Sequence, residues 1–115
     1  MRSDENSEPL WDIRRNIELA QSFIAGLSYE EFRSDRRTVY AVIRCLEIIS
    51  EASRKLSADL KARHPDLPWP DIAGAGNVYR HDYEDVLDRR VWHTVHNSLP
   101  PLGAAIEEEA QKLEK

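Results

Sequence analysis

A chain of 115 residues and 13.3 kDa has the length of one small domain with a single core. Its net charge of −5 excludes a broadly basic surface, so contact with nucleic acid is expected only within a local groove. The single cysteine, Cys45, and the lack of a long apolar run or signal-peptide core predict a cytoplasmic protein without a membrane span.

The first third of the chain predicts two helices behind a short tail. Residues 1–8 are polar and are expected to form a disordered tail, followed by one helical domain over residues 9–115. Apolar residues at three- and four-residue steps predict an amphipathic helix that ends at Gly26. They are Leu10, Ile13, Ile17, Ala20 and Ile24. Ser28 followed by Glu31 is a capping-box signal for a short second helix.

The strongest periodicity follows and predicts a long core helix with Asp35 as its N-cap. Its apolar stripe comprises Val39, Val42, Leu46, Ile49, Ser53 and Leu56. Ser57 can cap a further turn or two before the prolines of "HPDLPWP" (64–70) end the helix. The arginine-rich "RSDRR" (33–37) could line a groove for RNA, although scattered surface arginines are the commoner interpretation.

The second half predicts further helices and no strand. Pro70 suits the first turn of a helix through "DIAGAGNVYRHDY" (71–83). The two glycines inside it each cost about 1 kcal/mol relative to alanine, a cost usually offset by close approach of another backbone. A last helix is expected from about Asp88, with a kink or interruption at Pro100 and Pro101. The chain therefore predicts an all-α bundle.

Several landmarks occur in a distinctive order between about residues 10 and 102. They are "DRRTVYAVIRCLEIISEA" (35–52), "HPDLPWPDIAG" (64–74), "HDY" (81–83) and "VWHTVHNSLPPL" (91–102). This order resembles the HepT family, the ribonuclease toxins within the larger HEPN group of helical domains. The resemblance implies a four- to five-helix bundle of HEPN type without a sheet, which assembles as a homodimer with a cleft at its interface.

The family's motif is Arg-Asn, a few residues, then His-x-Tyr. Asn77, His81 and Tyr83 match it, whereas Gly76 stands where the family has arginine. Arg80 follows Gly76 by four residues, which sweep about 400° of a helix, so its side chain would project near the missing one. We hypothesise that Arg80 supplies the lost guanidinium and His81 the proton transfer of RNA cleavage. Asn77 would orient the imidazole or bind a phosphate oxygen.

The resemblance also implies a function and partners. It implies the toxin of a type VII toxin–antitoxin module, a metal-independent endoribonuclease with no cofactor, acting on an RNA such as tRNA or mRNA. A cognate MNT-type nucleotidyltransferase antitoxin would silence it by AMP transfer to Tyr83. The alternative is a catalytically inactive HEPN dimer that serves as a partner- or nucleotide-binding subunit, because the motif arginine is absent at Gly76.

Other histidines and the tryptophans favour structural roles. His93 and His96 are three residues apart and share a helix face, but no third ligand has convincing spacing, so solvated or core-edge histidines are favoured over a metal site. Trp11, Trp69 and Trp92 are expected to pack in the core or the dimer interface.

Overall fold

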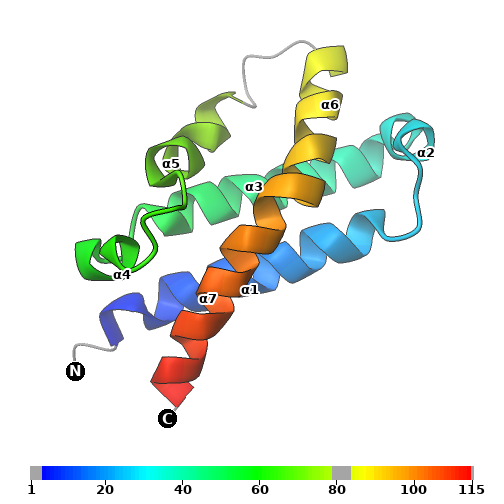
Figure 1. Ribbon diagram of the computed structural model, residues 1–115. Coiled ribbons are helices and arrows are strands. Elements are labelled where there is room, and N and C mark those ends of the chain that lie inside the picture. The colour runs from blue at the N-terminus through cyan, green and yellow to red at the C-terminus, as the bar shows by residue number, and fades with distance from the viewer. Residues whose placement is uncertain (1–3, 79–83, 115) are drawn as a thin grey trace.

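The computed structural model describes residues 4–78 and 84–114, and the side chains of residues 5–76 and 84–114. Within these ranges the chain is helical and contains no strand, which confirms the predicted all-α fold. Helices α1 (Asp4–Ile24) and α3 (Arg36–Ser53) lie side by side, and the chain turns back between them through α2 (Tyr29–Ser34) (Figure 1). None of the described helices combines the length and apolarity required to cross a bilayer.

Local signals set the boundaries between these helices as predicted. Gly26 has φ of +80°, a left-handed conformation that glycine adopts without steric cost, and it follows the end of α1. Ser28 and Glu31 form the capping box: Ser28 Oγ accepts from Glu31 N at 3.1 Å, and Glu31 Oε1 accepts from Ser28 N at 2.9 Å. Asp35 caps α3 by accepting a hydrogen bond from Thr38 N.

The beginning of α1 differs from the sequence prediction. The helix starts at Asp4, so residues 4–8, predicted to be part of a disordered tail, are helical. The reason is a long-range contact between Asn6 and Ser57, which caps α4 (Ala58–Ala62). Asn6 Nδ2 donates to Ser57 Oγ at 3.1 Å, and Asn6 Oδ1 accepts from Ser57 N at 2.8 Å. These bonds fasten the first turn of α1 to the start of α4.

Both predicted apolar stripes are buried. The positions named from the sequence on α1 and α3 are all 6% exposed or less. The core is completed by residues from the C-terminal third of the chain: Val91, Val95, Leu99, Leu102 and Ile106. The two long helices therefore form one layer, and the C-terminal helices cross it and cover its inner side (Figure 1).

The C-terminal third is a continuous run of helix. It comprises α6 (Glu84–His93), the π-helical turn η1 (Thr94–Ser98) and α7 (Leu99–Glu114), and it begins one turn before the predicted Asp88. The kink or interruption expected at Pro100 and Pro101 is replaced by the widened turn, in which Leu99 N donates to Thr94 O. Because proline lacks an N–H and crowds the carbonyl four residues earlier, a wider preceding turn lets the helix continue.

Candidate active site

The predicted site residues lie around the junction of α5 (Trp69–Val78) and α6 in the sequence. The backbone of Asn77 belongs to the last turn of α5. Arg80, His81 and Tyr83 lie outside the described residues, so their roles stay predictions. What the structure describes is the scaffold on either side of them.

The last turns of α5 are fastened to α3 through the carbonyl of Ala73. Ser50 Oγ donates to Ala73 O at 2.7 Å, and Arg54 donates to the same oxygen from Nε at 3.1 Å and from Nη2 at 2.8 Å. Ser50 Oγ also accepts from Gly76 N at 3.4 Å. These bonds fix the turn of α5 that leads into Asn77.

Gly76 lies against α3. This is the close approach of a neighbouring backbone that the sequence predicted for the glycines of this helix. Gly76 is buried, and a Cβ added there would lie 3.5 Å from Ser50 Oγ and 4.0 Å from Glu47 Cα. Gly74, by contrast, has no such neighbour within 4 Å. A side chain at position 76 would therefore start out against the surface of α3, which bears on the missing motif arginine.

The start of α6 is fastened to the other end of α3 by an ion pair. Arg36 donates to Asp88 from Nη1 at 2.8 Å and from Nη2 at 3.2 Å, and only 1% of Asp88 is exposed. Nη1 of Arg36 also donates to Arg33 O at 2.9 Å. The hydrogen bond to Asp88 raises the pKa of Arg36 further above its usual range, so this guanidinium stays charged.

Between these two contacts, α3 leaves part of one face uncovered. Arg36, Tyr40, Ile43, Glu47, Ser50 and Arg54 follow one another at three- and four-residue steps and share that face. Its ends are occupied by α6 and α5, whereas Tyr40 in between is 61% exposed. This stretch of α3 lies between the points at which α3 contacts the two helices that flank the motif in the sequence.

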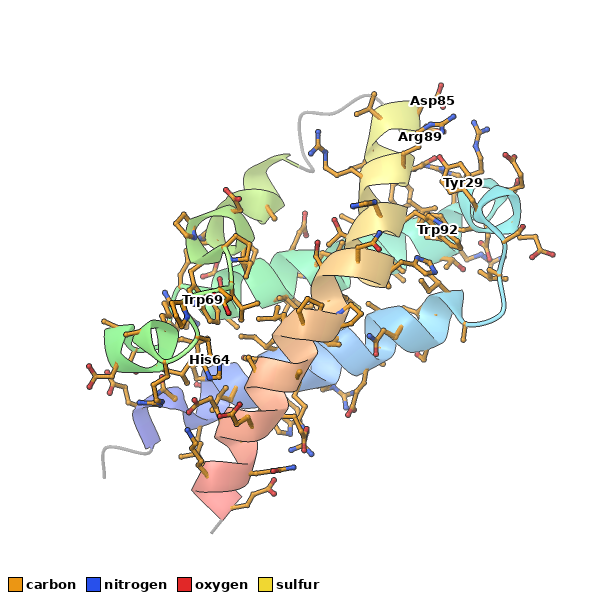
Figure 2. The ribbon with its side chains drawn as sticks, in the orientation of Figure 1. Tyr29, His64, Trp69, Asp85, Arg89 and Trp92 are labelled. Carbon is orange, nitrogen blue, oxygen red and sulfur yellow. The ribbon has the colours of Figure 1, made fainter. Side chains whose placement is uncertain are left out.

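An aromatic cluster fastens α2 to α6 (Figure 2). The ring of Trp92 lies 5.2 Å from that of Phe32 and 5.8 Å from that of Tyr29, and Arg89 lies over Tyr29 at 5.6 Å. Trp92 therefore packs as predicted, and so does Trp69, which is partly buried against the core. Trp11 is 58% exposed and lies outside the core, so the dimer interface, the other place expected for it, stays a prediction.

The histidines of the C-terminal helix are engaged by neighbours within it. His96 Nδ1 donates to Trp92 O at 2.9 Å, and its ring lies against that of Trp92 with centroids 4.2 Å apart and planes tilted by 45°. His93 Nδ1 lies 3.0 Å from Asn97 Nδ2, from which it accepts a hydrogen bond. These contacts agree with the structural interpretation that the sequence favoured over a metal site.

A different group has the geometry to hold a metal ion, and the sequence did not reveal it. Ligand atoms of His64, Glu108 and Glu109 lie within 4.8 Å of one another. Glu109, 3% exposed, already accepts from Arg63 at 2.8 and 3.1 Å, from His64 at 2.7 Å and from Lys112 at 3.3 Å. A metal ion would meet the positive charges of Arg63 and Lys112, so the cluster fits a structural tie between α4 and α7.

The same cluster has a marked electrostatic effect. The hydrogen bond from Arg63, helped by those from His64 and Lys112, lowers the pKa of Glu109 to about 2 despite the burial that opposes ionisation. Glu109 is therefore ionised throughout the neutral range. Because Arg63 and His64 are 45 or more residues away in sequence, no local spacing could have indicated the contact.

The helical bundle and the motif at its α5–α6 junction define an all-α domain of HEPN type. A family model described as "Ribonuclease HepT-like" matches residues 13–109. The chain therefore belongs to the HepT-like ribonuclease family, as the resemblance of its motifs indicated.

Named relatives support the same family. A "Probable ribonuclease HepT" of Thermococcus cleftensis is 40% identical over 98 residues, which cover 85% of this chain and 89% of that protein. A protein of Methanocaldococcus jannaschii named "Putative RNase" is 33% identical over 106 residues, which cover 92% of this chain and 91% of that protein. Another protein named "Putative RNase", from Caldanaerobacter subterraneus subsp. tengcongensis, is 35% identical over 89 residues, which cover 77% of this chain and 80% of that protein. Among solved structures there is no match at a significant level.

Proposed function

We propose that the protein is a metal-independent endoribonuclease that acts in the cytoplasm as the toxin of a type VII toxin–antitoxin module. The observation that carries this proposal is the HepT-like match over residues 13–109, which spans the motif residues Asn77, His81 and Tyr83. The active form is a homodimer whose interface cleft contains a motif from each subunit, and the substrate is an RNA such as tRNA or mRNA.

Proton transfer and charge stabilisation are the two tasks of the site. The imidazole of His81 takes the proton of the attacking hydroxyl, and the second subunit's copy of the same histidine, protonated, returns one to the leaving oxygen. Asn77 supports the imidazole or binds a phosphate oxygen from the turn of α5 that Ser50 and Arg54 fasten to α3. No metal or cofactor is required for these steps.

Arg80 supplies the cation that the family's motif places one turn earlier. The burial of Gly76 against Ser50 and Glu47 supports this assignment, because a guanidinium at position 76 would have to pass along α3. Arginine suits the role since its planar fork binds two phosphate oxygens at once.

Tyr83 is the point of control. An MNT-type nucleotidyltransferase antitoxin transfers AMP from ATP to its hydroxyl oxygen with release of pyrophosphate, which adds a bulky anion two residues from His81 in the sequence and repels the phosphates of RNA. This part of the proposal rests on the intact His-x-Tyr spacing alone.

One observation favours a second candidate function. The absence of arginine at position 76 is compatible with a dimer that has lost cleavage and serves as a partner- or nucleotide-binding subunit. The two candidates differ in whether His81 and Arg80 are needed for any measurable activity.

The deciding experiment measures growth arrest on expression and cleavage of total RNA by the purified protein. We expect His81→Ala and Arg80→Ala each to lower the cleavage rate by about 10²- to 10⁴-fold, the usual contribution of a general acid–base or charge-stabilising group. His93→Ala and Arg15→Ala are the matched controls, since both residues are exposed and lie on α6 and α1. If the wild type cleaves no RNA, or all five proteins behave alike, the binding-subunit function replaces the nuclease.

A further inference from the structure

We propose that Tyr40 is a binding platform for one unpaired nucleobase of the RNA substrate. The proposal deepens the ribonuclease function and rests on it for the identity of the ligand. It concerns described residues of α3 and assigns a role to a side chain outside the family's motif.

Tyr40 is one of the few large apolar side chains that are exposed among the described residues, together with Trp11, Val86 and Phe23. It is 61% exposed, whereas the described aromatic residues of α2 and α6 pack on one another and on the core. An exposed tyrosine ring has no packing partner on its open side, so a planar ligand can stack there.

The position of the ring is fixed by an anchored cation. The guanidinium carbon of Arg36 lies 5.6 Å from the centroid of the Tyr40 ring. Arg36 is itself held by two hydrogen bonds to Asp88, whose side chain is 1% exposed. A buried carboxylate thus orients an arginine, and the arginine supports an aromatic ring at the surface, so little side-chain entropy remains to be lost when a base stacks.

The charges around Tyr40 fit a polyanion. On the surface of α3, Arg37 precedes it by three residues and Arg44 follows it by four, which places both beside the ring. Arg37 is exposed and has no carboxylate within ion-pair distance among the described residues, while Arg44 is 71% exposed and only loosely paired with Glu47 at 3.5 Å. A base stacked on Tyr40 would therefore have guanidinium groups available to its flanking phosphates.

The location also fits. Tyr40 lies on the uncovered stretch of α3 between the α5 contact at Ser50 and the α6 contact at Arg36. The motif connects those same two helices in the sequence, so a nucleotide held at Tyr40 would lie between the contacts that α3 makes with the two helices flanking the motif.

A protein partner fits this surface less well. Stable protein interfaces bury about 800 Å² per partner around an apolar centre. The neighbours of Tyr40 along α3 are arginines, and the adjacent apolar residue, Ile43, is already partly buried. A single aromatic ring among guanidinium groups is the pattern that non-sequence-specific single-strand binding uses.

The test compares Tyr40 with a matched pair elsewhere. Trp11 on α1 is 58% exposed, and Arg15 lies over its ring at 5.6 Å, the same separation as in the Arg36–Tyr40 pair. The full-length wild type, Tyr40→Ala, Tyr40→Phe and Trp11→Ala are titrated against a fluorescently labelled single-stranded RNA of about ten nucleotides, within the usual site size. Cleavage kinetics are measured on the same proteins.

We expect Tyr40→Ala to weaken RNA binding and raise KM by about 5- to 150-fold, the loss of one base–aromatic stack, with kcat little changed. Tyr40→Phe keeps the ring and should bind as the wild type does, and so should Trp11→Ala. Equal affinity of the wild type and Tyr40→Ala would overturn the proposal. A change of oligomeric state in Tyr40→Ala, with RNA affinity intact, would overturn it in favour of a protein contact.

The design separates this inference from the nuclease function. If the wild type binds RNA through Tyr40 but cleaves none, the nuclease function is rejected and the binding role of Tyr40 is kept. If the wild type cleaves RNA and Tyr40→Ala has an unchanged KM, the nuclease function is kept and the binding role of Tyr40 is rejected. If the wild type binds no RNA, both proposals are rejected.

Discussion

Two buried carboxylates, Glu109 and Asp88, lie near opposite ends of the continuous C-terminal helix, and they differ in the side chains that bind them. Glu109 accepts hydrogen bonds from Arg63, His64 and Lys112, so three side chains converge on one carboxylate. Asp88 accepts two hydrogen bonds from Arg36, and that arginine also pairs with Glu84 at 3.7 Å and lies over the exposed ring of Tyr40. Figure 2 shows the two regions far apart, with His64 near one end and Trp92 near the other.

The comparison separates an ion-pair cluster that joins two parts of the bundle from one that also contacts an exposed ring, where we propose a base-binding surface. At Glu109 the side chains of Arg63, His64 and Lys112 all converge on one buried carboxylate. At Asp88 the carboxylate is buried, and Arg36, which binds it, lies over a ring that faces solvent. A buried ion pair that contacts an exposed aromatic ring is therefore the better place to look for a binding function.

The largest effect on stability is expected from Asp88→Ala. Removing this 1%-exposed carboxylate takes away the two hydrogen bonds between Arg36 and Asp88 and leaves a gap between α6 and α3, so the free energy of unfolding should fall by about 3 kcal/mol. RNA affinity should fall as well, because Tyr40 loses its support. Denaturant unfolding and RNA titration measure the two effects.

Asp85→Ala is the control for that change. Asp85 belongs to the same helix and pairs with Arg33 at 3.3 Å, but 79% of its side chain is exposed. Exposed pairs contribute little, so the loss should be below about 1 kcal/mol. Equal losses of stability in Asp88→Ala and Asp85→Ala would show that the buried ion pair of Asp88 contributes no more than the exposed pair of Asp85.

Glu109→Gln should cost about 2 kcal/mol at neutral pH and leave RNA affinity unchanged. The amide keeps part of the hydrogen bonding but not the attraction to Arg63 and Lys112. Glu108→Gln, at a 62%-exposed neighbour that pairs with Lys112 at 3.9 Å, is the control and should be nearly neutral. Weaker RNA binding in Glu109→Gln would contradict the separation of the two regions.

The same carboxylate predicts a pH dependence. The pKa of Glu109 is lowered from 4.5 to about 2 in the folded protein, so its stabilising contribution is complete above the unfolded pKa and is lost as pH falls through the folded one. The stability difference between the wild type and Glu109→Gln should therefore shrink between pH of about 4.5 and 2. A difference that stays constant over that range would show that Glu109 is not stabilised as an anion.

Ser50→Ala should lower stability by about 1 kcal/mol and also lower RNA cleavage, because the last turn of α5 loses hydrogen bonds at Ala73 and Gly76. Ser53→Ala is the matched control: Ser53 is equally buried on the same helix, but its hydroxyl donates to Ser50 O within α3 at 2.7 Å. We expect the two variants to lose similar amounts of stability. Only Ser50→Ala should also be impaired in RNA cleavage. Equal cleavage by both variants would refute a positioning role for Ser50.

The smallest effect is expected from Gly76→Ala. The added methyl group would lie 3.5 Å from Ser50 Oγ, an ordinary contact, and alanine favours the helix. Stability should rise by about 0.5–1 kcal/mol, measurable as a higher unfolding midpoint. A loss instead would mean that α5 and α3 cannot accommodate even a methyl group between them.

The fold was predictable where short-range patterns determine it. The stripes on α1 and α3 and the caps at Ser28, Asp35 and Ser57 depend on spacings of a few residues, and the structure confirms them. The helical start at Asp4 was missed because it depends on Asn6 meeting Ser57, which lies 51 residues away. The widened turn before Pro100 was missed because proline can interrupt a helix or be accommodated by it.

The candidate site was predictable only as a motif. Asn77, His81 and Tyr83 were recognised from their order and spacing, which need no structure. The supports could not be recognised this way. In the sequence, Ser50 is an ordinary position of a helix, and its role is visible only once α5 is known to lie beside it. The role of Arg36 likewise depends on its contact with Asp88, which lies 52 residues later.

The π-helical turn at Thr94–Ser98 has a consequence for how this chain can vary. A π-helical turn holds about one residue more than an α-helical turn, so deleting one residue there can restore an ordinary α-turn and leave the side chains of α7 in their present directions relative to α6. Ile106 and Glu109 would then stay in the interior together with Asp88. We therefore expect relatives to differ by one residue in the length of this turn and to keep an apolar residue at the position of Val95, which is 2% exposed.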